Sequence, residues 1–452
     1  MMSLSELAQA VNGTQLGKDA FFSGVSIDGR AIKSGDLYVA IKGERFDGHD
    51  FIQQASQAGA VGSLVEQAEL TNSPSVSVEE TRLALGILGK YWRQRFNFPV
   101  VAITGSNGKT TVKELTTAVL ARRYNTLATA GNLNNELGVP LTLLKLRTEH
   151  QAAVIEMGAN HPGEIAYLAN LASPTIGVVT NAGAAHLEGF GDLQGVANAK
   201  GELFTALPDN ATAILNHDDE FYATWKSLAD DRQILSFGLS EQADVSANNI
   251  EIKHTAQGIC SRFHLEYQGE SQNVNLPLTG LHNVVNGLAA AAVGIAVGMT
   301  LTEIADGLAS VAPVAGRLQT LRGIQNSILV NDSYNANPSS FEAALQAIQN
   351  FGTERWCVLG DFGELGEQHS LLHQQLAQQA KKYGVTRIFA TGELTQLTVA
   401  EFGDGATFYN SQDALITALK EQLNEGAVVL VKGSRAQKLE VIVEAITDES
   451  AA

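Results

Sequence analysis

The sequence predicts an α/β protein of three domains, and two observations support this fold class. Short apolar runs alternate with helix-compatible stretches along most of the 452 residues, as in mainly parallel sheets wrapped by helices. One run, Val100–Ile103, leads into the glycine-rich segment Thr104–Thr111 and then into a helical stretch, which is the order of a strand, a phosphate-binding loop (P-loop) and a helix. We expect a small N-terminal α/β domain at 1–82, a central P-loop domain at 83–312 and a C-terminal Rossmann-like α/β domain at 313–452.

The composition is that of a globular chain, and it narrows the range of partners. Hydrophobic residues make up 44% of the chain and charged residues 17%, which excludes a disordered protein. The formal net charge of −18 argues against a general nucleic-acid or membrane-surface binder, because such proteins present basic faces to phosphates. Cys260 and Cys357 have neither a metal-ligand nor a disulfide-framework spacing, and the N-terminus lacks a basic and then apolar signal pattern. We therefore expect a cytoplasmic protein.

The first 82 residues carry the pattern of a small α/β domain. We expect helices at 4–11 and 50–58 and strands near 25–27, 37–41 and 60–65. Between these strands lie polar residues that could bind a polar ligand, namely Ser26, Asp28, Arg30, Lys42, Arg45, Asp47 and His49. Their spacing alone favours solvated loops.

The central domain follows a helical stretch at 81–96. Its predicted strands, separated by helical segments, are 100–103, 152–155, 175–180 and 212–215. Between 244 and 280 apolar and polar residues alternate, which predicts antiparallel strands at an edge of the sheet. Residues 271–302 carry no charge and are numerous enough to span a bilayer. Their small side chains, the polar Asn286 and the lack of aromatic anchors favour a buried helix beginning near His282, so we expect no integral membrane segment.

The glycine-rich segment has the side chains that a nucleoside triphosphate needs. Glycines let backbone N–H groups and the helix N-terminus surround phosphates. Lys109 would reach the outer phosphates, and Thr110 would hold Mg²⁺. The common pattern has a glycine five residues before Gly108, where this chain has Ile103, so the loop is two residues shorter than usual. A chance glycine turn is disfavoured, because strand, Gly-Lys-Thr and helix occur together in order.

Two polar residues follow predicted strands of the same sheet. Glu156 ends the run at 152–155, and His186 comes shortly after the run at 175–180. Ligands of parallel sheets bind outside the carboxyl ends of the strands. A carboxylate and an imidazole there could ligate a divalent metal bound to ATP, although spacing alone leaves ordinary loop residues equally open.

Lys200 falls on the apolar face of the helix predicted at 193–207, between Val196 and Leu203. A buried ammonium is costly unless it is paired or modified. The ordinary interpretation is a lysine that extends from that face to solvent. The functional interpretation is an amine kept neutral enough to react with carbon dioxide, which would give a carbamate as a second negative ligand near the metal.

The third domain repeats the alternation of strands and helices. The expected strands are 328–330, 356–359, 387–390 and 428–431, with helices beginning near 338, 369, 413 and 436. After its first strand, Asn331–Pro338 places six polar side chains at a ligand-facing position. A helix-capping turn explains one or two of them but not Asp332 and Tyr334. Arg317 could clamp a phosphate with its guanidinium, although an exposed arginine is the simpler interpretation.

Taken together, these segments resemble the ordered motifs of the Mur ligases through all three domains. They are Thr104–Thr111, Glu156–Gly158, Asn181–Glu188, Ala199–Glu202, His282–Asn283 with Asn286, and Asp332–Pro338. The short P-loop is the one that this family uses. The Asp-Ser-Tyr-Asn-Ala-Asn-Pro segment is similar to the MurF type, the ligases that join D-alanyl-D-alanine to UDP-N-acetylmuramoyl-tripeptide.

The resemblance implies a role for each matching residue. Lys109 would hold the ATP phosphates, Thr110 and Glu156 would hold one Mg²⁺, and His186 with carbamylated Lys200 would help place a second. The residues implied to bind ATP are Gly105, Ser106, Asn107, Gly108, Lys109, Thr110, Thr111, Asn283, Arg317 and Asp332. The residues implied to contact substrate are Ser26, Asp28, Arg30, Gly43 and Asp47 at the uridine nucleotide end, and Tyr334, Asn335 and Asn337 near the peptide junction.

The implied reaction is the ATP-dependent joining of an acid to an amine in peptidoglycan precursor synthesis. The substrate carboxylate would attack ATP to give an acyl phosphate, which the amine of D-alanyl-D-alanine would then displace. A sister ligase that adds a single amino acid and a P-loop switch ATPase remain as alternatives. We expect a monomer without nucleic-acid partners.

Overall fold

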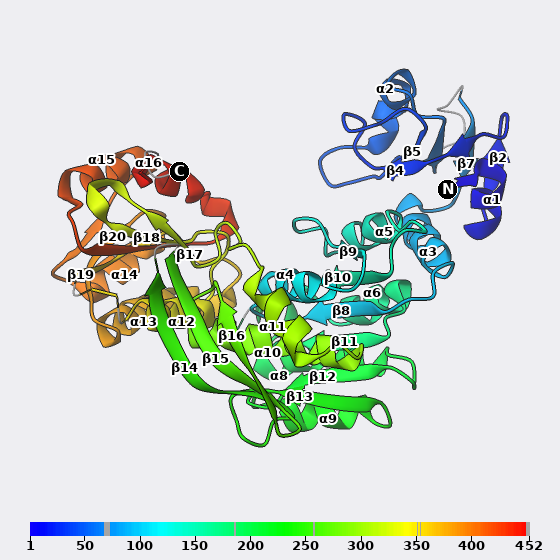
Figure 1. Cartoon of the computed structure of the whole chain (residues 1–452). Helices are drawn as coiled ribbons and strands as arrows, with labels where there is room; N and C mark the ends of the chain where they lie inside the picture. The colour runs from blue at the N-terminus through cyan, green and yellow to red at the C-terminus, as the bar shows by residue number, and fades with distance from the viewer. Residues whose placement is uncertain (67–72, 185–186, 256–257, 350, 353, 449–452) are drawn as a thin grey trace.

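The computed structural model describes residues 1–66, 73–184, 187–255, 258–349, 351–352 and 354–448. Three larger sheets follow one another along this described chain, with five, nine and six strands. Helices cover them, as Figure 1 shows from the blue N-terminal part through the green centre to the red C-terminal part. The predicted fold class, α/β with three sheet-containing parts, is confirmed. We call the parts of the chain that contain the five-, nine- and six-stranded sheets the first, central and third units.

The first sheet has the strand order β2-β7-β6-β5-β4. Its strands β4 to β7 are parallel to their neighbours, and β2 runs antiparallel to β7. The strands of this region are β1 (Met2–Ser3), β2 (Thr14–Leu16), β3 (Phe21–Phe22), β4 (Gly24–Ser26), β5 (Asp36–Val39), β6 (Gly62–Val65) and β7 (Ser75–Ser77). Its helices are α1 (Leu4–Ala10), η1 (Gly48–Phe51) and α2 (Ile52–Gln57).

The central sheet has the order β16-β15-β14-β13-β12-β11-β8-β10-β9. Strands β8 to β13 pair in parallel, whereas β14, β15 and β16 form the antiparallel edge that the sequence predicted. The strands are β8 (Val100–Thr104), β9 (Thr126–Ala128), β10 (Ala152–Glu156), β11 (Ile176–Val179), β12 (Thr212–Asn216), β13 (Gln233–Phe237), β14 (Val245–Thr255), β15 (Gly258–Tyr267) and β16 (Glu270–Leu276).

Helices pack on both faces of this sheet, because its strands direct apolar side chains to both faces. Val100 and Ala102 of β8 belong to one core, and Val101 and Ile103 belong to the other. The first face carries α3 (Thr81–Arg93), α5 (Gly138–Leu143), α6 (Glu164–Ala172), α7 (Leu187–Phe190), α8 (Leu193–Thr205) and α9 (Tyr222–Ala229). The second carries α4 (Lys109–Leu120), α10 (Leu281–Ala296) and α11 (Leu301–Ala309).

The uncharged stretch at 271–302 forms β16 and the buried helix α10, as predicted. Small residues let the neighbours of α10 approach it closely, since a Cβ added to Gly294 would lie 2.7 Å from the Ile304 side chain. Within the described residues, no helix combines the length and apolarity that crossing a membrane requires.

The third sheet has the order β17-β18-β22-β19-β20-β21 and is parallel except for β17. Its strands are β17 (Gln319–Arg322), β18 (Ile328–Asp332), β19 (Glu354–Leu359), β20 (Val385–Ala390), β21 (Ala406–Phe408) and β22 (Ala427–Lys432). Its helical segments are η3 (Ile324–Asn326), α12 (Pro338–Ile348), η4 (Gly366–Gln368), α13 (His369–Lys382), α14 (Thr395–Phe402), α15 (Gln412–Gln422), η5 (Arg435–Gln437) and α16 (Glu440–Ile446).

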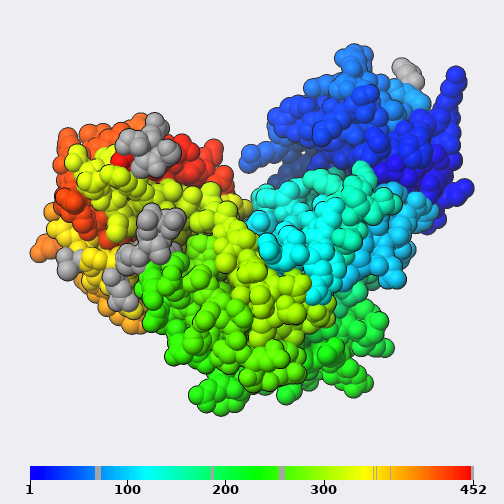
Figure 2. Space-filling view, viewed as in Figure 1, coloured from blue at the N-terminus to red at the C-terminus, as the bar shows by residue number. Residues whose placement is uncertain are grey.

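The first and third units both contact the central one. Arg147 donates to the Ser23 carbonyl of the first unit (2.8 Å), and Asn107 of the P-loop bonds to Asn337 and Ser339 of the third. Figure 2 shows a hollow between the first and third units, above the central one. A cavity lined by residues of all three units opens here.

Candidate functional site

The cavity has a volume of about 1080 Å³ and lies at the carboxyl ends of the central and third sheets. This is where open parallel sheets bind ligands. The sequence-predicted residues that line it are Ser106, Asn107, Gly108, Lys109, Thr110, Thr111, Glu156, Asn283, Arg317, Asp332, Tyr334, Asn335 and Asn337. Segments more than 200 residues apart in the sequence therefore meet at one site.

The P-loop needs glycine at two positions for backbone reasons. Gly108 has φ +80° at the N-cap of α4, and Gly105 has φ +142° at the end of β8. A Cβ on Gly105 would lie 2.0 Å from the Thr180 hydroxyl, and one on Gly108 would lie 2.5 Å from Asn286 Oδ1. Glycine at both positions therefore lets the backbone follow this path into α4, whose N-terminal N–H groups favour an anion.

Hydrogen bonds fix the loop to the segment that follows the neighbouring strand β11. The Asn107 amide donates to Asn181 Oδ1 (2.9 Å), and the Asn107 carbonyl accepts from the Thr180 hydroxyl (2.6 Å). Ser106 is held too, since its hydroxyl accepts from the Gly183 amide (2.9 Å). These bonds order the loop before a ligand arrives, which lowers the entropic cost of binding.

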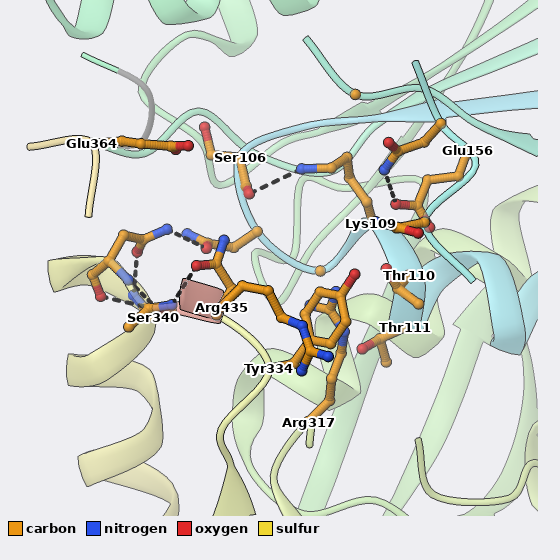
Figure 3. A pocket seen from close by; sticks show the side chains of 18 of the residues that line it. Ser106, Lys109, Thr110, Thr111, Glu156, Arg317, Tyr334, Ser340, Glu364 and Arg435 are labelled. Carbon is orange, nitrogen blue, oxygen red and sulfur yellow. Dashed lines mark hydrogen bonds between the residues drawn. The ribbon is translucent and has the colours of Figure 1, made fainter. Parts of the chain in front are cut away.

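Lys109 turns back on the loop that precedes it. Its Nζ donates to the Gly105 carbonyl (2.7 Å) and to the Ser106 carbonyl (3.2 Å), and Figure 3 shows the second of these bonds. Burial lowers the pKa of Lys109 to about 8, and the nearby Glu156 opposes this shift. A phosphate group would offer stronger charge-assisted bonds than these two neutral carbonyls.

Glu156 offers an oxygen that lacks a partner in the described structure. Asn134 Nδ2 donates to its Oε1 (2.8 Å), whereas its Oε2 is buried without a hydrogen-bond partner. A buried oxygen of a carboxylate is costly when left unpaired. Oxygen ligands of this kind suit Mg²⁺, and Thr110 lines the same cavity. The donor set thus fits a magnesium ion, even though the described residues include no group of three or more His, Cys, Asp or Glu side chains placed to hold a metal ion by themselves.

Lys200 is buried, as its position on the helix face predicted, with 1% of its surface exposed. Its Nζ lies 3.4 Å from the Ala159 carbonyl and 5.0 Å from the centre of the Phe190 ring. Burial, with a smaller contribution from the Lys109 charge, lowers its pKa to about 7. Lys200 does not line the cavity, but Ala159 does. The predicted His186 lies outside the described residues.

The third unit supplies a wall of charged and aromatic side chains opposite the P-loop. Arg317 lies over the Tyr334 ring at 4.3 Å from its centre, and its buried Nε has no hydrogen-bond partner in the described structure. Figure 3 shows this pair facing Thr110 and Thr111. Asp332 Oδ2 accepts from Lys432 (2.5 Å), and burial raises the pKa of Asp332 against the effect of this ion pair.

Some cavity residues were missed by sequence reasoning. Lys432 directly follows the run 428–431, so the rule about carboxyl ends of strands points to it, and Arg435 lies three residues further on. His282, which belongs to one of the sequence motifs but was given no role, also lines the cavity, and burial lowers its pKa to about 4. Asn134 lies in a loop whose sequence has no pattern that predicts a binding residue.

The residues predicted at the uridine nucleotide end are not among those that line the cavity. Asp28 accepts from the backbone and side chain of Arg30, in a turn also held by Ser26. Asp47 accepts from His49 Nδ1 (2.6 Å), and the Gly43 amide donates to the Phe46 carbonyl (2.9 Å). The structure thus brings the predicted residues at 106–111, Glu156, Asn283 and those of the third unit to one cavity, whereas Lys200 and these five residues of the first unit do not line it.

Comparisons with known proteins agree with this arrangement. Three family descriptions match in succession: "Mur ligase family, catalytic domain" at 22–101, "Mur ligase middle domain" at 103–294 and "Mur ligase, glutamate ligase domain" at 316–435. The chain belongs to the Mur ligase family. Its resemblance to that family, read from the motifs, is therefore confirmed.

Individual members of the Mur ligase family match over nearly the whole chain. The UDP-N-acetylmuramoyl-tripeptide–D-alanyl-D-alanine ligase of Escherichia coli (strain K12) is 44% identical, covering 99% of this chain and 98% of its own. A crystal structure of MurF from Acinetobacter baumannii superposes with a TM-score of 0.91 at 35% identity, covering 98% of both chains. The MurF ligase of Thermotoga maritima in complex with ADP gives 0.82 at 27% identity, covering 93% of this chain and 96% of that one.

Proposed function

We propose that this Mur ligase joins D-alanyl-D-alanine to the terminal carboxylate of UDP-N-acetylmuramoyl-tripeptide and converts ATP to ADP and phosphate. The observation that carries the proposal is the single cavity in which a P-loop, an unpartnered carboxylate oxygen and a cationic wall of the third unit face one another. The choice of substrates follows the name of the 44% identical relative, whose match covers 99% of this chain.

ATP would bind with its phosphates at the P-loop and the start of α4. The backbone N–H groups from Asn107 to Thr111 and the helix dipole favour the negative charge there. Lys109 would exchange its two backbone carbonyl partners for phosphate oxygens. Arg317 and Asn283, which line the same cavity, would contact the nucleotide from the other side.

Magnesium would be held by Glu156 and Thr110 together with phosphate oxygens. Its charge would neutralise the triphosphate, so that a negative carboxylate can approach. Lys200, as a carbamate, and His186 would help to hold a second ion. The burial of Lys200 supports this part of the proposal, since a low pKa leaves the amine neutral and able to react with carbon dioxide.

The reaction has two steps. An oxygen of the tripeptide carboxylate attacks the γ-phosphorus of ATP, the bond to the β-phosphate oxygen breaks, and ADP leaves. The neutral amine of D-alanyl-D-alanine then attacks the carbonyl carbon of the acyl phosphate, phosphate leaves with the bonding electrons, and the nitrogen loses a proton. Lys109 would stabilise the charge on the transferred group, and the surrounding residues would act mainly by positioning.

The first unit would hold the uridine nucleotide end of the long substrate, through contacts from Ser26, Asp28, Arg30, Gly43 and Asp47. Tyr334, Asn335 and Asn337 would lie near the peptide junction. Movement of the third unit toward the first would exclude water from the acyl phosphate. We place this reaction in the cytoplasm and in a monomer.

A two-substrate assay tests the proposal. The purified protein should release ADP only when UDP-N-acetylmuramoyl-tripeptide and D-alanyl-D-alanine are both present, and the amide product should form in equal amount. A panel of acceptor amines separates a sister ligase, which would prefer a single amino acid. ADP release that needs neither substrate and responds to a protein partner would instead support a switch ATPase.

A further inference from the structure

The wall formed by the third unit presents three described cationic side chains to the cavity. Two of them already have a partner or a proposed ligand. Lys432 is buried and is bound to Asp332 and to the Asn335 carbonyl (3.0 Å). Arg317 stacks on Tyr334 and, in the proposed function, contacts the nucleotide. The remaining cation is Arg435, at the carboxyl end of β22.

Arg435 is held at the cavity by two contacts that leave most of its donors available. Its Nη1 pairs with Glu440 Oε1 (3.0 Å) at the start of α16, and its guanidinium carbon lies 5.6 Å from the centre of the Tyr334 ring. The Arg435 side chain is 59% exposed. A guanidinium has five N–H donors in a planar fork that matches a carboxylate, so this one can bind a second carboxylate beside Glu440.

The acceptor in the proposed reaction carries such a group. A dipeptide must place its amine at the acyl phosphate, and its other end is a carboxylate with a single negative charge. Glu440 already neutralises part of the Arg435 charge. The positive charge that remains suits a ligand with a single negative charge better than a triphosphate. The P-loop, which is suited to the triphosphate, lies on the opposite wall of the cavity.

We propose that Arg435 binds the C-terminal carboxylate of the acceptor dipeptide and makes the enzyme specific for acceptors with a free carboxylate. This inference rests on the proposed function, because it concerns the second substrate of that reaction. Tyr334, which lies within cation–π distance of both arginines, would keep the acceptor arginine and the nucleotide arginine in fixed relative positions.

The test compares D-alanyl-D-alanine with D-alanyl-D-alaninamide, which lacks the negative charge, in the wild type and in Arg435→Ala. The wild type should prefer the free acid by about 10- to 100-fold in kcat/KM, the usual effect of hydrogen bonds to a charged group. Arg435→Ala should lose this preference through a raised dipeptide KM, with the KM for ATP unchanged. Arg435→Lys should keep part of the preference.

Arg387→Ala is the matched control. Arg387 also stacks on an aromatic ring, 5.0 Å from the centre of Trp356, but it does not line the cavity. This variant should keep the wild-type preference for the free acid and the wild-type KM for the dipeptide.

Three results would overturn the inference: an Arg435→Ala enzyme that still prefers the acid, a variant whose KM rises for ATP alone, or a wild type that uses the amide as well as the acid. The last result needs no variant, so it holds even if Arg435→Ala fails to fold. Turnover of the wild type without any dipeptide would instead refute the proposed function.

Discussion

The contact between the P-loop and the third unit depends on one side chain, and replacing it gives a quantitative test. Asn107 Oδ1 accepts from Asn337 Nδ2 (2.8 Å), and Asn107 Nδ2 donates to the Ser339 hydroxyl (2.9 Å). Each such bond contributes about 0.5–1.5 kcal/mol. Because one bond is exposed and the other only partly buried, Asn107→Ala should weaken docking of the third unit by about 1–2 kcal/mol in total, which is about 5- to 30-fold in the docking equilibrium.

The assay combines small-angle X-ray scattering, which reports the separation of the units, with steady-state ADP release. Asn107→Ala should increase the radius of gyration and lower kcat. Asn337→Asp is the informative partner variant, because its carboxylate keeps the helix cap on the Ser340 amide (2.8 Å) but no longer donates to Asn107. The double variant should show non-additive effects. Additive effects, or wild-type scattering and kcat in Asn107→Ala, would refute a role for this contact in docking.

Three further outcomes follow from the site and its surroundings. Gly108→Ala should weaken the ATP affinity measured by calorimetry at least about tenfold, because its φ of +80° and a Cβ 2.5 Å from a side-chain oxygen of α10 both strain the loop. The control is Gly403→Ala, which has φ +73° and open space around it and should bind ATP normally. Lys200→Ala should nearly abolish turnover, and short carboxylic acids should partly restore it; full activity without additive would contradict the carbamate. Burial lowers the pKa of His373, so below about pH 6.5 the unfolded state takes up a proton that the folded state resists. The unfolding midpoint should therefore fall as the pH drops below about 6.5, and less steeply in His373→Gln; equal slopes in the two proteins would exclude this effect.

Local patterns were sufficient to predict the P-loop and the burial of Lys200. The loop is a contiguous segment, and the lysine follows the periodicity of its own helix. Helix ends were less certain, because they depend on backbone angles. The helix expected to begin near Ala436 starts at Glu440, since Lys438 adopts φ +51° and separates η5 from α16.

Contacts between distant segments could not be predicted in this way. Asn134 binds Glu156 across 22 residues, and Lys432 binds Asp332 across 100. No pattern in either segment depends on the other, so only the folded chain joins them. Most strands of two or three residues, such as β9 and β21, were missed because alternation is hard to recognise over so short a length.

The most direct measurement is the dependence of ADP release on the two substrates other than ATP. If the cavity activates an acid for joining to a dipeptide, omitting either UDP-N-acetylmuramoyl-tripeptide or D-alanyl-D-alanine should reduce ADP release to background, and adding both should give one amide bond per ADP. Equal ADP release with and without the dipeptide, and no amide product, would contradict the account.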